Sequence, residues 1–205
     1  MIRRVFFRAA RRAQETGNAP AASTPAAAWT NFLLVRANVR GGYYREVPLD
    51  PGTPFPTIAL RDERGRAAAI PQGEVLYAFF KTTCPTCELA WPYLDRIGKL
   101  AKAGSLSVVA VSQDDPEATA RFYEDLGVAV PTLYDREPWG ASEAVQLENV
   151  PTFFVVGPDG VVRDASTGFQ RHKMEEFASL AADRAGRRPA ALFLPGDDVP
   201  VMKPG

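Results

Sequence analysis

Apolar and polar positions alternate in blocks along residues 49–185 of this chain. Short apolar runs have the length and composition of buried strands, and they lie at residues 55–60, 67–70, 74–80, 106–112 and 151–156. Apolar residues at helical spacing fall between or after them, at 85–103, 116–126, 142–147 and 171–184. Strands that alternate with helices predict an α/β fold, whose central sheet is covered on both faces.

The two cysteines of the chain follow one of these buried strands directly. Cys84 and Cys87 come after the run at 74–80, where the predicted strand passes into the predicted helix. A helix that begins there directs free N–H groups and its positive dipole end at Cys84, which favours the nucleophilic thiolate. Cys87 lies one turn further on, close enough to attack a mixed disulfide formed on Cys84. The spacing therefore favours a dithiol that cycles with a disulfide.

Other uses of a cysteine pair fit the sequence less well. A structural zinc site needs four ligands, whereas this chain offers one pair of cysteines and a single histidine, His172. A structural disulfide across three residues closes too small a loop to restrict the unfolded chain strongly. Buried, inert cysteines would not require the strand, proline and helix around them, so redox chemistry is the favoured interpretation.

With these residues in place, the sequence Cys84-Pro85-Thr86-Cys87 resembles the motif of the thioredoxin superfamily, and of its TlpA-like, redoxin-domain thiol-disulfide oxidoreductases in particular. The resemblance covers approximately residues 49–185. It implies a thioredoxin-like fold with a central mixed β-sheet, helices on both faces and a TlpA-like βα insertion.

Three further features support the resemblance, in the order that the family has them. Pro92 occupies the place of the proline within the first long helix, and residues 157–160 form the turn of a terminal hairpin. Pro151 opens the strand between them and is implied to be the cis-proline beside the disulfide. Val150 is then implied to pair with an extended substrate, with Pro85 and Thr86 as further substrate-binding residues.

The sequence also departs from the family pattern at three places. Ala78 and Ala90 stand where related proteins often carry an acid, and Thr83 replaces a tryptophan. The general base for Cys87 is therefore open. Lys81 and Glu88 are the nearest ionisable side chains in sequence, and Lys81 is able to favour the Cys84 thiolate by its charge.

The expected function is that of a thiol-disulfide oxidoreductase that exchanges disulfides with protein or small thiol partners and is then reduced again by an electron donor. Neither an organic cofactor nor a metal is implied. One alternative is a peroxiredoxin-like thiol peroxidase, but Tyr77 and Lys81 occupy the proline and hydroxyl positions of that family's signature. The other is a Sco-like copper-binding chaperone, in which two thiolates and His172 would bind Cu(I).

Composition and charge place the rest of the chain around one domain. Of 205 residues, 46% are hydrophobic, and 24 basic residues balance 24 acidic ones, which gives no case for nucleic acid or stable membrane insertion. Residues 1–48 are expected to be a basic arm and linker, 49–185 the thioredoxin-like domain, and 186–205 an irregular tail. Five arginines in residues 1–12 are not followed by an apolar signal core, so a cytoplasmic protein is expected, with a periplasmic or membrane-associated protein as the alternative. The protein is further expected to be a monomer.

Overall fold

The computed structural model describes residues 47–102 and 104–205, so the N-terminal arm predicted for residues 1–48 lies almost wholly outside the described residues. In chain order the elements are β1 (Glu74–Phe80), α1 (Pro85–Ala101), β2 (Leu106–Ser112), α2 (Pro116–Leu126), β3 (Thr132–Tyr134), α3 (Gly140–Ala144), β4 (Thr152–Val156), β5 (Val162–Thr167), β6 (Phe169–Gln170), α4 (Arg171–Arg184) and β7 (Met202–Lys203). The predicted alternation of strands and helices is confirmed.

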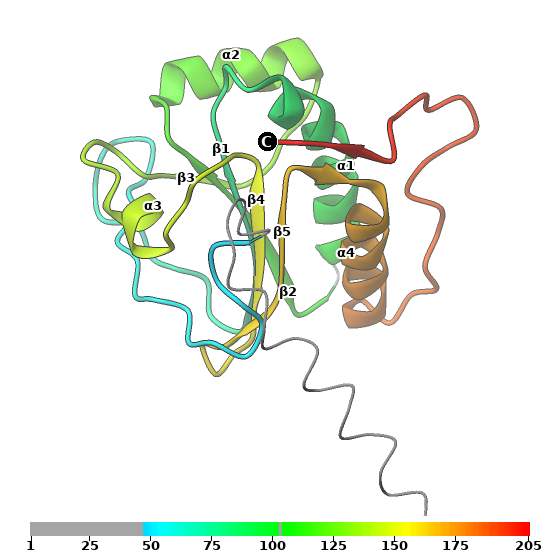
Figure 1. The fold of residues 1–205 in the computed structure, drawn as a ribbon, viewed down its shortest axis with the longest axis horizontal. Coiled ribbons are helices and arrows are strands. Elements are labelled where there is room, and N and C mark those ends of the chain that lie inside the picture. The colour runs from blue at the N-terminus through cyan, green and yellow to red at the C-terminus, as the bar shows by residue number, and fades with distance from the viewer. Residues whose placement is uncertain (1–46, 103) are drawn as a thin grey trace, which may run out of the picture. The chain divides into compact units, whose positions relative to one another are not determined.

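The central sheet has five strands in the order β3-β2-β1-β4-β5 (Figure 1). The strands β1, β2 and β3 are parallel, whereas β4 runs antiparallel to both β1 and β5. Ala78, in the middle of β1, faces Ala110 of β2 and Phe153 of β4. This arrangement confirms the thioredoxin-like α/β fold with a mixed sheet. Because β1 is the middle strand, its carboxyl end lies near the middle of one end of the sheet.

The central strands bury both of their faces. Alternate side chains of β1 enter two separate core clusters, one containing Leu76 and Phe80 and the other containing Tyr77 and Phe79. Helices α1 and α4 cover the first cluster, while α3 and the segment 47–70 contribute to the second. Because a strand presents successive residues to opposite faces, a continuous apolar run is what a two-sided core requires.

The leading hairpin predicted at residues 55–70 is present only as isolated bridges. Arg61 pairs with Ala67 and with Tyr134 of β3, and no regular strand forms in this segment. Its contacts are largely made by side chains: the Phe55 ring stacks on Tyr77 with 5.1 Å between centroids. The segment contains three prolines between residues 51 and 56, and a residue without an N–H cannot donate to a strand ladder.

The two tryptophans in the described part of the chain have different environments. Trp91 is fully buried on α1, where its ring centroid lies 4.2 Å from that of Phe80. Trp139 is 40% exposed and precedes α3. Phe153 and Phe154 are both fully buried, as expected for core residues on opposite faces of β4.

The tail after Gly186 is only partly irregular, which corrects the expectation for residues 186–205. Leu192 and Phe193 are buried in the core cluster beside α1 and α4, and β7 pairs with β6 in a second, two-stranded sheet. The compact unit of the fold accordingly continues to Gly205 rather than ending near residue 185. No helix among the described residues is long and apolar enough to cross a membrane.

Candidate active site

The sequence between β1 and α1 folds so that Cys84 caps the helix. Its backbone is extended, with φ −90° and ψ 114°, and Pro85 takes the first helical position. A proline fits there because the N–H that it lacks would have no partner within the helix. The Sγ of Cys84 accepts a hydrogen bond from the backbone N–H of Cys87 at 3.1 Å. The first sulfur is therefore held against the N-terminus of α1.

The two thiols, both free in this structure, lie in unequal surroundings. Cys84 is partly exposed, whereas Cys87 is completely buried within the core cluster. An exposed sulfur is open to a second molecule, and a buried one is reached only from the neighbouring residue. The geometry thus separates an accessible thiol from a sheltered one.

The same surroundings separate their acidities. The pKa of Cys84 is lowered to about 6, chiefly by a hydrogen bond from the Cys87 thiol to the Cys84 sulfur. The N–H groups of Cys87 and Thr86 and the charge of Lys203 lower it further, whereas burial acts in the opposite direction. Burial raises the pKa of Cys87 far above its usual value, and the Cys84 sulfur and the charge of Asp114 raise it further. At neutral pH Cys84 is mainly thiolate and Cys87 is a thiol.

The loop before β4 meets the cysteines from the other side. The peptide bond between Val150 and Pro151 is cis. In its protonated state, the Cys84 thiol donates to the carbonyl oxygen of Val150 at 3.2 Å. The predicted site residues Cys84, Cys87, Val150 and Pro151 therefore gather at one end of the sheet, because β4 runs antiparallel beside β1 and begins where β1 ends.

The two flanking charges suggested by the sequence lie elsewhere. The ammonium of Lys81 lies 5.7 Å from the centroid of the Trp139 ring, and Glu88 is an exposed residue in the first turn of α1. The acidic group that acts on Cys87 is Asp114, which accepts a hydrogen bond from the N–H of Thr82 at 2.6 Å. Its position at the carboxyl end of β2, next to the end of β1, is the signal by which sequence reasoning could have found it.

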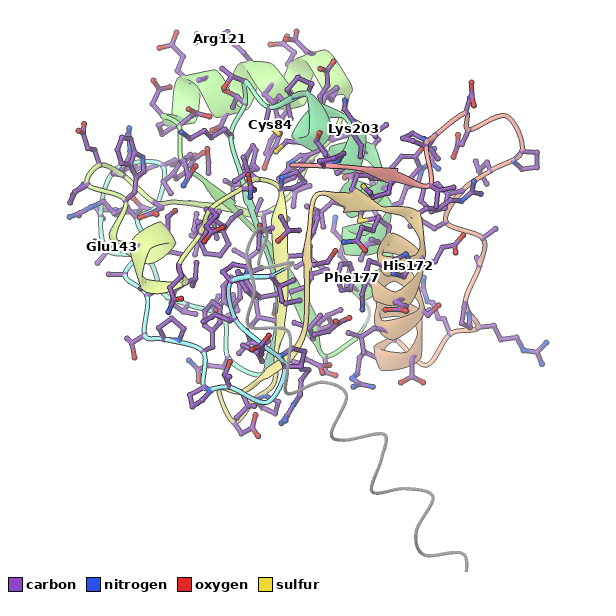
Figure 2. The ribbon with its side chains drawn as sticks, viewed as in Figure 1. Cys84, Arg121, Glu143, His172, Phe177 and Lys203 are labelled. Carbon is purple, nitrogen blue, oxygen red and sulfur yellow. The ribbon has the colours of Figure 1, made fainter. Side chains whose placement is uncertain are left out.

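A second missed group comes from the C-terminal tail. The Lys203 ammonium donates to the carbonyl oxygen of Pro85 at 2.9 Å, and the Thr86 hydroxyl donates to the carbonyl oxygen of Pro204 at 2.6 Å. Figure 2 shows Cys84 and Lys203 near each other at the same end of the molecule, beside the first turns of α1. No sequence signal predicts this contact, since the partners are more than one hundred residues apart.

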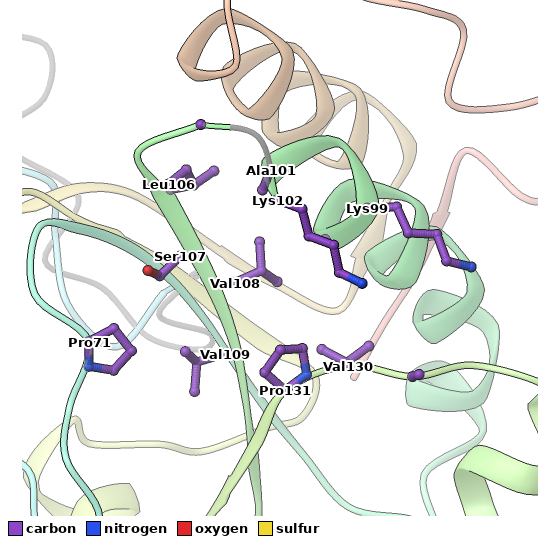
Figure 3. A pocket seen from close by; sticks show the side chains of 13 residues that line it. Pro71, Lys99, Ala101, Lys102, Leu106, Ser107, Val108, Val109, Val130 and Pro131 are labelled. Atoms are coloured by element: carbon purple, nitrogen blue, oxygen red, sulfur yellow. The ribbon is translucent and has the colours of Figure 1, made fainter.

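Other features of the described residues offer no comparable chemistry. No group of three or more histidine, cysteine, aspartate or glutamate side chains in this part of the chain is placed to hold a metal ion. His172, the third ligand of the copper alternative, is an exposed residue at the start of α4. A pocket of about 320 Å³ lies at the far end of α1 from Cys84, bordered by Lys99, Lys102 and Pro131 among others (Figure 3).

Comparison with known proteins agrees with this site. The chain is 25% identical over 159 residues to the thiol-disulfide oxidoreductase ResA of Halalkalibacterium halodurans, which covers 77% of this chain and 86% of ResA. It is 28% identical over 163 residues to the methylamine utilization protein MauD of Methylorubrum extorquens, covering 76% of this chain and 75% of MauD.

Solved structures show the same fold. The thioredoxin domain of a thiol-disulfide oxidoreductase from Bacteroides vulgatus superposes with a TM-score of 0.53 and 20% identity, over 59% of this chain and 91% of that domain. Residues 51–165 match the model of the AhpC/TSA family, and this range includes both cysteines and Pro151. The chain therefore belongs to the AhpC/TSA family, and within the thioredoxin superfamily it is a thiol-disulfide oxidoreductase.

Proposed function

We propose that the protein exchanges disulfides with extended cysteine-containing protein segments, with Cys84 as the attacking thiol and Cys87 as the resolving thiol. The observation that carries the proposal is the asymmetry of the pair: the accessible sulfur has a pKa of about 6, and the buried sulfur stays protonated. A dithiol with one ionised, accessible member needs no cofactor to start exchange, because the thiolate is itself the nucleophile.

The reaction then proceeds in two balanced steps. The Cys84 thiolate attacks one sulfur of the substrate disulfide, a Cys84–substrate bond forms, and the other substrate sulfur leaves as a thiolate. Cys87 next attacks Cys84, so that the intramolecular disulfide forms, the second substrate sulfur leaves, and the Cys87 proton ends on a released substrate sulfur. Two electrons pass to the substrate, and a separate electron donor must reduce the Cys84–Cys87 bond before another cycle.

The low pKa of Cys84 bears on the direction of exchange. A stabilised thiolate favours the reduced protein, so the low pKa of Cys84 makes the couple more oxidising than it would be with an ordinary thiol. We propose the cytoplasm as the compartment, where ambient thiols would supply electrons to the Cys84–Cys87 disulfide.

Trapping of the covalent intermediate tests the assigned roles. Cys87→Ala should accumulate a mixed disulfide with a model protein disulfide such as insulin, detected by mass under non-reducing conditions, because nothing resolves it. Cys84→Ala should form none, and wild type should turn insulin over with dithiothreitol as the donor. An adduct on Cys84→Ala but not on Cys87→Ala would reverse the assignment, and no adduct on either variant would overturn the proposal.

A further inference from the structure

The C-terminal segment Val201–Gly205 runs along the active site. Its strand β7 pairs antiparallel with β6, where Lys203 lies opposite Phe169, and the N–H of Arg171 donates to the carbonyl oxygen of Val201 at 2.9 Å. In Figure 1 this segment, drawn in red, crosses the beginning of α1. It is thereby aligned by backbone hydrogen bonds rather than by surface side chains alone.

The segment touches both halves of the thiol site. The Thr86 hydroxyl binds the Pro204 carbonyl, and Thr86 is only 4% exposed although it belongs to the first turn of α1. On the opposite side, a β-carbon placed on Gly205 would lie 2.6 Å from the Val150 carbonyl oxygen. The segment therefore fits between the cysteine motif and the residue that precedes Pro151, where only a glycine leaves enough room.

Contacts upstream hold the segment to the domain. The Phe193 ring packs in the core with 4.6 Å between its centroid and that of Tyr93. The guanidinium of Arg96 donates to the Leu192 carbonyl at 2.9 Å and to Asp197 at 2.8 Å. With a core anchor before it and a strand pairing within it, the segment positions Lys203 as part of the fold.

We propose that Lys203 is a positioning residue of the thiol site: the C-terminal segment presents its ammonium group at the start of α1, where the positive charge stabilises the Cys84 thiolate. The hydrogen-bond partner of this ammonium is the neutral Pro85 carbonyl, which does not cancel the charge. Coulombic attraction to Lys203 is one of the causes that lower the pKa of Cys84, after the hydrogen bonds from Cys87 and Thr86.

Neighbouring charges do not replace it. Lys81 lies over the Trp139 ring, Glu88 is exposed, and the carboxylate of Asp114 acts on Cys87. The helix N-terminus already provides N–H groups to Cys84, so Lys203 adds to an existing preference rather than creating it. Since the lysine is partly exposed, its contribution should be modest and should weaken with salt.

The pKa of Cys84 in three lysine variants tests the proposal. The pH dependence of iodoacetamide labelling at Cys84, followed by mass spectrometry on the reduced full chain, gives this pKa directly. Lys203→Met should raise the Cys84 pKa by about half a unit, which makes the thiolate fraction at a pH below the pKa roughly threefold smaller. Lys203→Arg keeps the positive charge and should retain the wild-type pKa. Lys102→Met, which removes an exposed lysine at the other end of α1, is the matched control and should also match wild type.

Thr86→Val separates the charge from the contact that holds it. The variant removes the hydroxyl donor to Pro204 at nearly constant volume, so it should raise the Cys84 pKa in the same direction as Lys203→Met. The double variant should give no larger shift than Lys203→Met alone, because both changes act through one ammonium group.

Two results would overturn the proposal: an unchanged Cys84 pKa in a normally folded Lys203→Met protein, or equal shifts in Lys203→Met and Lys203→Arg, which would indicate a packing effect. The inference rests on the proposed role of Cys84, but the two fail differently. Labelling measures thiolate formation without turnover, so a wild-type protein that labels normally and yet traps no substrate would contradict the proposed function alone.

Discussion

Cys84 and Val150 are joined by a hydrogen bond of 3.2 Å from the thiol to the carbonyl oxygen. The bond requires the thiol proton, because a thiolate cannot donate to a carbonyl. Ionisation therefore removes this contact and leaves the N–H of Cys87 as a donor to the sulfur. The ionised sulfur therefore keeps the hydrogen bond from the N-terminus of α1 but not the one to the loop before Pro151.

The buried thiol should control the acidity of the exposed one. In Cys87→Ala, the hydrogen bond that contributes most to the low pKa of Cys84 is lost, so this pKa should rise from about 6 by about one unit. Iodoacetamide labelling against pH measures it. Leu89→Ala, which shortens a half-buried side chain on the same helix, is the control and should leave the pKa unchanged; a low pKa retained in Cys87→Ala would contradict the expectation.

The stability of the reduced protein should depend on pH through both cysteines. The folded-state pKa of Cys84 is about 6, well below the ordinary cysteine value of 9.0, so its stabilising contribution is fully present above pH 9 and is lost as the pH falls through 6. The raised pKa of Cys87 acts oppositely: its contribution is present below 9.0 and declines above that value.

Urea unfolding of the reduced chain and of Cys84→Ser isolates the first effect. The difference in free energy of unfolding between them should increase from about pH 6 to about pH 9, in favour of the wild type. A difference that stays constant over this range would show that Cys84 titrates alike in the folded and unfolded chains.

The buried tryptophan should matter to stability far more than the exposed one. Trp91→Ala empties a core site against Phe80 and should lower the free energy of unfolding by about 3–5 kcal/mol. Trp139→Ala removes a 40% exposed ring and one hydrogen bond to the Gln113 carbonyl, so the loss should be no more than about 1 kcal/mol. Urea titrations followed by far-UV circular dichroism compare them, and similar losses would count against the assigned burial.

A buried carboxylate should be required where α3 begins. Asp135 is 2% exposed and accepts hydrogen bonds from the N–H groups of Ala141 and Ser142 and from the Ser142 hydroxyl. Asp135→Ala leaves these donors unpaired and should cost about 3 kcal/mol in unfolding free energy. Asp125→Ala, at an exposed position of α2, should change little. Equal, small losses in both variants would refute a structural role for Asp135.

The central strands and long helices could be predicted because their signals are local. The run that forms β2 is buried along nearly its whole length, and α2 begins after Asp115, whose side chain accepts from the N–H of Ala118 at 2.7 Å. The helix α3 was expected at 142–147 but spans Gly140–Ala144, since Asp135, a residue outside the helix, satisfies its first N–H groups. A cap supplied from another segment leaves no pattern within the helix itself.

The candidate site likewise contains residues that the sequence predicts and residues that it does not. The cysteine motif and Pro151 could be found from spacing and resemblance, and the structure brings them together at one end of the sheet. The helix start predicts the acidity of Cys84, but the raised pKa of Cys87 could not be derived from sequence, because it depends on the burial of this thiol and on the charge of Asp114. Lys203 reaches the site through a two-residue strand and a carbonyl contact, neither of which has a distinctive composition.

The buried faces of β1 also have a consequence for redesign of the protein. Because its side chains pack into a core on either side, a variant library directed at the strand would be depleted by unfolding before specificity changed. Diversity is better introduced at exposed positions in the stretches that form the site, such as Lys81, Thr83, Asn149 and Val201. These positions come from three separate stretches of the chain, so recombination of whole gene segments would separate positions that need to be selected together.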